Sequence, residues 1–371
     1  MSKGYTHKGY TLEAFATTGK PHYEVEKITH EAPALDEYQV LIKVKACGVC
    51  HTDVMFADLL PPGAVLGHEA VGEVVEFGPK VEHLKRGELV GYAYMKSSCL
   101  NCFQCHSGND IMCRKRHMFP DGKNNGFAYA AVCDARFVYK IPKSIEAKHA
   151  GPLMCAGSTV FSAIYGANVS PTARIAIAGI GGLGHLGLQF ARAWGCYVVA
   201  ISSNPSKKEE ALKFGAHEYW CSKDFTPEFV ENAEKFDLIL STISDDIDYD
   251  VYLNLLNPNG NFRLVGIPPG EIKFKNVLPF LLDQKNFTGA ILGGRKVNQL
   301  MLDFAARHNI RAQIEEYPLT AEGISEAMER VHHGKARYRA VLVAPEDQEE
   351  ATLTSNVEGL RINQAPSINS S

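Results

Sequence analysis

The sequence lacks any apolar segment long enough to cross a membrane. A helix that spans a bilayer needs about 20 consecutive apolar residues, and no run in the 371-residue chain approaches that length. The first fifteen residues, MSKGYTHKGYTLEAF, contain no apolar core of a secretory signal. We therefore expect a cytoplasmic protein without a membrane partner.

The chain also lacks a strong excess of charge and any internal repeat. Its 38 Lys and Arg residues nearly balance 42 Asp and Glu residues, which gives a net charge of −4. No basic field is present to hold a nucleic acid, so we expect no such partner. The hydrophobic fraction of 45% is ordinary for a globular protein. A chain of 371 residues is long enough for about two domains.

The first part of the chain has the pattern of a β-rich domain. Residues from about 10 to 45 have a strand-like pattern, as in residues 40–44. Glycine and proline are frequent between Pro61 and Gly91, which indicates turns between strands.

After about Ala150 the pattern changes to short apolar runs that alternate with helical segments. This alternation predicts a parallel sheet built of βαβ units, and therefore an α/β protein with a doubly wound second domain. The predicted strands are residues 174–178, 197–201, 236–240, 261–265 and, as a candidate closing strand, 287–292, and the predicted helices are residues 183–194, 207–214 and 252–256.

The last third of the chain is expected to return to the first domain. A helix is predicted at residues 296–308 and a strand at residues 338–343. We predict one domain from residues 1–155 and 295–345 and a second from residues 156–294. Residues 346–371 are polar and charged without periodicity, which predicts a disordered tail.

Four of the ten cysteines lie in one short segment. Cys99, Cys102, Cys105 and Cys113 have the spacing C-x2-C-x2-C-x7-C. Disulfides are rare in reducing compartments, and four thiolates in one loop form a closed tetrahedral zinc site, which is typical of structural zinc. An iron–sulfur cluster is the alternative, and the absence of a proline after the last cysteine disfavours it.

A second set of metal-binding residues is spread along the chain. Cys50, His68 and Cys155 form a Cys2His set, which is typical of a catalytic zinc ion with one open position. Such an ion acts as a Lewis acid on a carbonyl or alkoxide oxygen. Spacing alone does not distinguish Cys50 from Cys47 as the first ligand.

A glycine-rich turn follows the first predicted strand of the second domain. Residues 179–184 fit G-x-G-x-x-G and open a helix, which is the context of a dinucleotide-binding fingerprint. The first glycine permits the tight turn, the second lets the backbone approach the pyrophosphate, and the third allows close helix packing. The residues assigned to the cofactor here are Gly179, Gly181, Gly182, Leu183 and Gly184.

The next strand has no acidic residue at its end. NAD sites place an Asp or Glu about 20 residues after the glycine turn to hold the ribose 2′-hydroxyl. Ser202, Ser203, Lys207 and Lys208 occur there instead. Hydroxyl donors and a cation suit a 2′-phosphate, which favours NADP(H). The alternative is that the lysines only begin a solvated helix.

Taken together, these motifs resemble the medium-chain zinc-dependent alcohol dehydrogenase superfamily, and within it the cinnamyl alcohol dehydrogenase group. The resemblance extends from about residue 9 to residue 344. It implies a GroES-like catalytic domain, a Rossmann cofactor domain, two zinc ions per chain, NADP(H), and a homodimer. It rests on the motifs C-G-V-C-H-T-D, G-H-E, the four-cysteine loop, C-A-G-S-T-V, G-I-G-G-L-G, I-S-S with K-K-E-E-A-L, and R-Y-R.

The resemblance also implies roles for single residues. It selects Cys50 as the ligand and makes Cys47 a core residue. Thr52 corresponds to the hydroxyl that exchanges the substrate proton, and Glu69 to an acid that can approach the zinc. The remaining assignments are His51 near the cofactor phosphates, Thr159 beside the nicotinamide, and Ser202, Ser203 and Lys207 at the 2′-phosphate.

Two departures from the family affect the substrate and the proton path. Met55 stands where many members carry a histidine that relays a proton, and a thioether cannot do so. The loop between Cys50 and His68 is shorter than usual, and its Phe56, Leu59 and Leu60 suggest a hydrophobic or aromatic substrate. The prediction is an alcohol–carbonyl oxidoreductase. The alternatives are a reductase of activated C=C or C=N bonds and a non-catalytic NADPH-binding protein.

Overall fold

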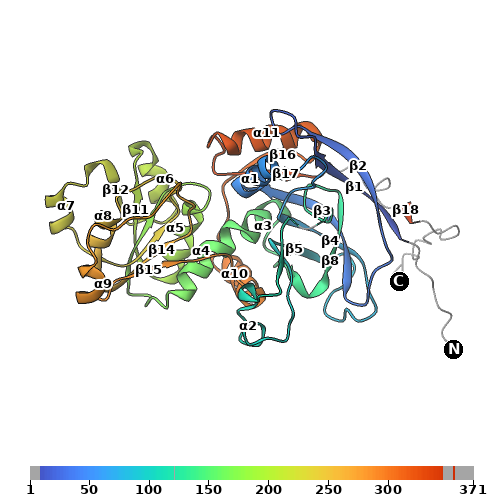
Figure 1. Cartoon of the computed structure of the whole chain (residues 1–371). Helices are drawn as coiled ribbons and strands as arrows, with labels where there is room; N and C mark the ends of the chain where they lie inside the picture. Colours follow the sequence, from blue (N-terminus) through green and yellow to red (C-terminus); the bar gives the residue numbers. More distant parts are fainter. Residues whose placement is uncertain (1–8, 121, 346–353, 356–371) are drawn as a thin grey trace, which may run out of the picture.

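The computed structural model describes residues 9–120 and 122–345 together with the strand Thr354–Ser355. Figure 1 shows two domains side by side, one around a parallel sheet and one rich in antiparallel strands. The described residues include no helix that is both long and apolar enough to span a membrane. The predicted disordered tail lies outside the described residues, except that β18 (Thr354–Ser355) pairs with Tyr10 and Thr11.

The β-rich domain is built on a seven-stranded sheet of order β16-β17-β3-β4-β5-β9, with β8 paired to β3. Its helices α1 (His51–Leu59) and α11 (Ala321–His332) lie against each other at one side of the sheet (Figure 1). Two small sheets, β18-β1-β2 and β6-β7, complete the domain. The strand bounds are β1 Tyr10–Thr17, β2 Val25–Ala32, β3 Gln39–Val49, β4 Glu69–Phe77, β5 Leu89–Tyr92, β6 Met95–Ser97, β7 His117–Met118, β8 Ala130–Asp134, β9 Val138–Lys140, β16 Ile314–Pro318 and β17 Arg339–Val343.

The second domain contains a six-stranded parallel sheet of order β12-β11-β10-β13-β14-β15. The chain runs outward from β10 to one edge and then from β13 to the other, so the order reverses between β10 and β13. In such sheets ligands bind at this switch point, beyond the carboxyl ends of the strands. The strand bounds are β10 Arg174–Ala178, β11 Tyr197–Ser202, β12 Glu218–Cys221, β13 Phe236–Ser241, β14 Leu256–Leu264 and β15 Asn286–Gly289.

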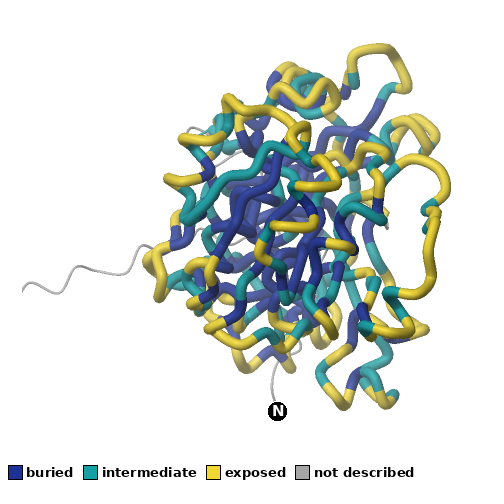
Figure 2. The backbone as a smooth tube through the Cα atoms, turned by 90° about the vertical axis from the view of Figure 1, so that its left-hand side faces the viewer, coloured by how far each residue is buried: buried dark blue, intermediate teal, exposed yellow. Residues whose placement is uncertain are grey.

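Both faces of this sheet are covered, which explains its nearly continuous apolar strands. Alternate residues of β10 point to opposite faces, so Ile175 and Ile177 belong to one buried cluster and Ala176 and Ala178 to another. Figure 2 shows buried segments in the interior, surrounded by exposed segments at the periphery. The helices of this domain are α4 Ala156–Gly166, α5 Gly184–Trp194, α6 Lys208–Lys213, α7 Pro227–Asn232, α8 Tyr249–Asn254 and α9 Leu278–Leu282. Helix α10 (Arg295–Arg307) follows them and contacts both α4 and β9.

The α/β fold with a doubly wound sheet is confirmed, with local corrections. The predicted helix at 252–256 is α8, which ends at Asn254, and Leu256 already belongs to β14. Apolar residues at the end of a helix and at the start of a strand give the same sequence pattern. The predicted boundary between this helix and the next strand was therefore wrong. Because β17 joins β3 in the antiparallel sheet, we propose that the chain passes between the domains near residues 155 and 295.

A buried histidine joins the two domains behind the glycine turn. His185 on α5 stacks on the Tyr338 ring at 4.9 Å and meets Phe214 edge-on at 5.3 Å. Its Nδ1 lies 3.1 Å from the Gly181 carbonyl oxygen, and its Nε2 accepts the Gln313 N–H at 3.3 Å. One nitrogen donates and the other accepts, so both are satisfied in the neutral ring. Burial lowers the pKa of His185 to about 4.

We expect His185 to make the folded protein sensitive to acid. The unfolded chain takes up this proton near pH 6.5 and the folded chain only near pH 4, so stability falls as the pH drops between these values. The difference corresponds to roughly 3 kcal/mol. Urea unfolding at pH 7 and pH 4.5 should show a smaller loss in His185→Gln than in wild type. The exposed control His308→Gln should behave as wild type, and equal losses in all three proteins would refute the role of His185.

Candidate active site

Neighbouring strands bring the predicted catalytic metal ligands together. Cys50 follows β3, His68 precedes β4, and β3 and β4 pair with Gly48 opposite Glu69. Cys155 lies directly before α4. One ligand atom from each of Cys50, His68, Glu69 and Cys155 lies within 4.8 Å of the others.

The chemistry of this set fits a metal ion. His68 and Glu69 are fully buried, yet His68 Nε2 and Glu69 Oε2 have no hydrogen-bond partner among the described residues. Buried polar atoms without a partner are costly unless something else, such as a cation, binds them. A hydrogen bond from Cys155, together with the nearby His68 ring, lowers the pKa of Cys50, which favours a thiolate. Two sulfurs and one imidazole nitrogen are the donors expected for catalytic zinc.

Asp53 orients this set, although the sequence analysis did not single it out. It is fully buried on α1, and its Oδ1 lies 3.0 Å from both His68 Nδ1 and the Gly67 amide nitrogen. Its Oδ2 accepts the Cys50 N–H at 2.9 Å. With Nδ1–H directed at the carboxylate, the lone pair of His68 Nε2 is left for a metal. The only sequence signal was its place in the C-H-T-D motif.

Glu69 is held by an arginine from the far end of the chain. Arg339 at the start of β17 donates through Nη2 to Glu69 Oε1, and both side chains are buried. Burial raises the pKa of Glu69 to about 7, and the Arg339 charge opposes that change. A Cβ at Gly48 would lie 2.0 Å from Glu69 Oε2, so any larger residue at this strand position would displace the Glu69 carboxylate.

The predicted proton-exchange residue lies next to the metal ligands. Thr52 Oγ1 is 3.7 Å from Cys50 Sγ. Thr159 on α4 is nearly buried, and its amide donates to the Cys155 carbonyl. Met55 is half-buried on α1. These residues come from α1 and α4, which begin immediately after two of the metal ligands.

Aromatic side chains surround His68. The Phe119 ring lies 4.9 Å and the Tyr94 ring 5.5 Å from the imidazole, and Phe56 meets Phe119 edge-on at 5.5 Å. Tyr94 and Phe119 were not identified from the sequence, because each comes from a distant segment. The segment after Cys50 is also mostly helix, and Leu59 is 69% exposed, so Leu59 is not part of this apolar wall.

A cleft of about 690 Å³ connects the metal site with the glycine turn. Cys50 and His51 line it from one domain, and Gly181, Gly182 and Leu183 from the other. The φ of Gly179 is +89°, a conformation that favours glycine. A Cβ at Gly184 would lie 1.9 Å from the Gly179 carbonyl oxygen, whereas one at Gly181 would meet nothing within 4 Å. The turn is therefore closely packed between Gly179 and Gly184 and open at Gly181, where a bound pyrophosphate needs space.

The residues predicted for the 2′-phosphate are only partly brought together. Lys207 lines the cleft, and its Nζ donates to the Ile180 carbonyl at 2.6 Å. The Ser202 hydroxyl is buried and accepts the Asn204 N–H at 3.2 Å, whereas Ser203 is exposed. Asn204 and Ser206 line the cleft and were not identified from the sequence. They lie in the turn between β11 and α6, where propensity does not fix side-chain direction.

The four cysteines of the short segment form a second compact set. Their ligand atoms lie within 4.8 Å of one another, and the Sγ atoms of Cys99 and Cys113 are 3.5 Å apart. Asp110 inside the loop receives the Arg295 Nε–H at 2.7 Å, which attaches the loop to α10. The four sulfurs are close enough together to bind one ion, as a closed structural site requires.

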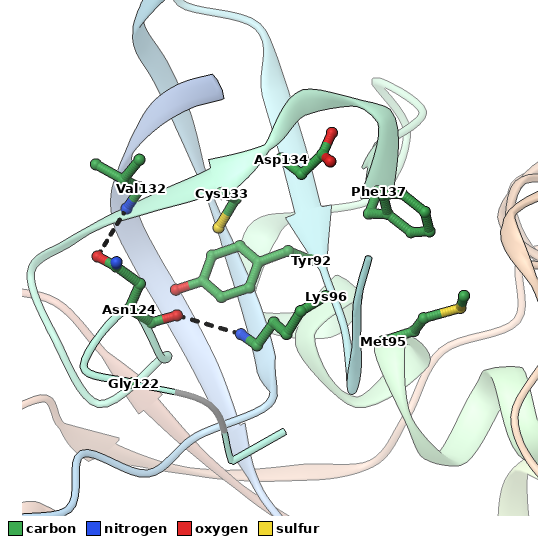
Figure 3. Close-up of a pocket in the computed structure, with 9 residues that line it drawn as sticks. All are labelled: Tyr92, Met95, Lys96, Gly122, Asn124, Val132, Cys133, Asp134 and Phe137. Atoms are coloured by element: carbon green, nitrogen blue, oxygen red, sulfur yellow. Dashed lines mark hydrogen bonds between the residues drawn. The ribbon is translucent and has the colours of Figure 1, made fainter. Parts of the chain in front are cut away.

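A separate cavity of about 260 Å³ lies in the β-rich domain (Figure 3). Lys96 donates to the Asn124 carbonyl at its rim, and Cys133 and Tyr92 line it. None of the predicted metal or cofactor residues is among the residues described around it. The predicted residues gather at the larger cleft between the domains, which is therefore the candidate site.

Comparison with known proteins agrees with this geometry. Residues 36–143 match the alcohol dehydrogenase GroES-like domain, and residues 182–307 match the zinc-binding dehydrogenase family. An aldehyde reductase of Synechocystis is 37% identical over 86% of this chain and 95% of its own length. An NADP-dependent alcohol dehydrogenase of Mycolicibacterium smegmatis is 35% identical over 90% of this chain and 97% of its own.

A solved structure extends the match to three dimensions. Cinnamyl alcohol dehydrogenase from Sorghum bicolor superposes with a TM-score of 0.80, at 31% identity over 90% of this chain and 97% of that one. Both domain families, their order along the chain and the overall fold are thus shared. The chain belongs to the medium-chain zinc-dependent alcohol dehydrogenase superfamily, in its cinnamyl alcohol dehydrogenase-like group.

Proposed function

We propose that the protein is an NADP(H)-dependent zinc alcohol dehydrogenase that interconverts an alcohol and an aldehyde or ketone. One observation carries the proposal: Cys50, next to the buried His68 and the partly buried Cys155, lines the same cleft as the glycine turn. A dinucleotide whose pyrophosphate is bound at the turn would then extend its nicotinamide towards a substrate oxygen at the metal site. The two relatives named above are an aldehyde reductase and an alcohol dehydrogenase.

NADP(H) is supported by the end of β11. Residues 203–208, directly after this strand, include no acidic side chain, and Lys207 lines the cleft at the start of the next helix. A carboxylate there would hold a ribose diol, whereas a cation attracts a 2′-phosphate. The Mycolicibacterium relative is named as NADP-dependent.

In the proposed mechanism the chain's residues bind, orient and exchange a proton. Cys50, His68 and Cys155 would hold a zinc ion, which would supply Lewis acidity at the substrate oxygen. Thr52 donates its hydroxyl proton to that oxygen during reduction, or accepts one during oxidation. Met55 cannot pass the proton on, so the exposed His51 at the cleft is the proposed next group.

The aromatic wall supports an aromatic or hydrophobic substrate. Tyr94 and Phe119 pack on His68, and Phe56 packs on Phe119. Flat apolar side chains exclude water and stack on planar rings. Aldehydes conjugated to a ring are therefore the first substrates to assay.

The other two interpretations are not favoured. A reductase of C=C or C=N bonds has no need for the ligand set beside Thr52, and the relatives act on alcohols or aldehydes by name. A protein that only bound NADPH would need neither the buried ligands nor their support from Asp53.

A homodimer is the proposed assembly, with a cytoplasmic location. Strand β15 forms one edge of the parallel sheet, where unpaired backbone groups can join a second copy. Nearby α9 exposes Leu281 at 69% and Leu282 at 76%. Ten free cysteines, including the clustered four, suit a reducing compartment.

The direct test is a zinc count combined with cofactor oxidation at 340 nm. We expect about two zinc ions per chain and oxidation of NADPH in preference to NADH with aromatic aldehydes. Two zinc ions and NADPH binding without aldehyde turnover would revive the C=C or C=N alternative.

The proton-exchange role predicts a selective loss in Thr52→Val. The valine keeps the shape of threonine but has no hydroxyl, so kcat should fall by about 10²–10⁴-fold at unchanged zinc content. Thr52→Ser restores the hydroxyl and should retain most of the activity. If Thr52→Val were fully active, Thr52 would not exchange the substrate proton.

A further inference from the structure

One carboxylate lies in the cofactor cleft among several basic side chains. Among the described residues of this cleft, Glu210 is the single acid, whereas Lys207, Lys335, Arg337 and Arg339 are basic. Glu210 lies on α6, three residues after Lys207 and therefore about one turn along the helix. A carboxylate so close to the proposed 2′-phosphate site would repel that phosphate if nothing balanced its charge.

The groups that balance the negative charge of Glu210 come from the β-rich domain. Arg337, just before β17, donates through Nη2 to Glu210 Oε1. Tyr338 donates its hydroxyl proton to Glu210 Oε2 at 2.7 Å. Each oxygen of the carboxylate is therefore bound by a residue of the β-rich domain.

The partners of Glu210 differ in how firmly they are held. Tyr338 is 8% exposed and packs on His185 and Phe214 of the cofactor domain. The Arg337 side chain is 61% exposed. An exposed ion pair adds little to stability, so the charge that Arg337 brings to the cleft matters more than its contribution to the fold.

We propose that Arg337 determines the preference for NADP(H) over NAD(H), because it neutralises Glu210 at the 2′-phosphate end of the cleft. This inference rests on the proposed function. In this arrangement Lys207 attracts the phosphate from within the cofactor domain. Arg337 acts from the opposite domain and removes the repulsion of the neighbouring carboxylate. NAD(H) lacks the 2′-phosphate, so its binding is insensitive to this pair.

Fluorescence titration of the purified zinc-loaded protein with NADPH and NADH tests the proposal without turnover. Arg337→Gln should weaken NADPH binding by about tenfold or more and leave NADH binding nearly unchanged. Glu210→Gln should bind NADPH at least as tightly as wild type. The double variant should recover most of the affinity lost in Arg337→Gln, because no carboxylate remains to be balanced. Arg307→Gln, an exposed site on α10, controls for the change in net charge.

The outcomes are separable. Unchanged NADPH preference in Arg337→Gln would overturn the inference while leaving the proposed function intact. Loss without recovery in the double variant would also overturn it and would indicate direct contact between Arg337 and the phosphate. Wild-type protein that bound neither cofactor would overturn the proposed function and this inference together. Thermal unfolding of each variant verifies that the fold is retained.

Discussion

His68→Ala will retain one zinc ion per chain and lose its activity, with kcat/KM falling by at least about 10³-fold. The imidazole is the only nitrogen in the Cys50–His68–Cys155 set, and its Nε2 is buried without any partner in the described protein. Alanine leaves two sulfurs and Glu69, which cannot complete the Cys2His set. Elemental analysis and steady-state kinetics on the same preparation measure both effects.

Asp53→Asn should have the same kind of effect as His68→Ala, but a smaller one. The asparagine would keep the shape of the side chain but lose the charge that faces His68 Nδ1 at 3.0 Å. Groups that orient a ligand in this way contribute about 10–100-fold in metal affinity or activity.

Loss of both zinc ions from His68→Ala would mean that the fold had failed, and full activity with two zinc ions would exclude His68 as a ligand.

The parallel sheet was predictable because each of its central strands is buried on both faces. The runs beginning at Arg174, Tyr197 and Phe236 are apolar without alternation, and β10, β11 and β13 begin at those residues. Strand β12 (Glu218–Cys221) was missed because it lies at the edge and none of its residues is fully buried. Burial on both faces produces a visible pattern in the sequence, and an edge position does not.

The residues that gather at the candidate metal site could be named from the sequence, but the residues that support them could not. Cys50, His68 and Cys155 were identified from residue type and from resemblance, and pairing of β3 with β4 brings the first two together. Arg339 lies 270 residues from its partner Glu69. No local spacing marks such a contact, and only the return of the chain through β17 creates it.

The same limit applies to the ribose end of the cleft. Lys207 was assigned from its place after the second strand, and it does line the cleft. The pair between Glu210 and Arg337 joins two domains and could not be foreseen from either segment alone. Specificity that depends on a contact between domains is therefore hidden from motif analysis.

Cys105→Ser is expected to remove the other zinc ion and to destabilise the β-rich domain while sparing the Cys50 site. Cys105 and Cys113 are buried, and Cys105 Sγ lies 3.6 Å from Cys102 Sγ. Serine is a hard, neutral oxygen donor and a poor replacement for a thiolate. The melting temperature should fall by about 10 °C, because losing a structural metal costs several kcal/mol and each kcal/mol is worth about 2–4 °C in a domain of this size.

Loss of the metal from the four-cysteine loop should lower the stability of the whole domain, because the loop packs against the rest of the molecule. Ile111 of the loop packs in one cluster with Met95, Phe137 and Leu292, and the Asp110–Arg295 pair ties it to α10. Cys221→Ser, at the far edge of the other domain, is the matched control and should keep both zinc ions. An unchanged melting temperature in Cys105→Ser would show that the loop is not structural. Iron with absorption near 400 nm in the wild type would instead establish the iron–sulfur alternative, and a colourless protein with two zinc ions would exclude it.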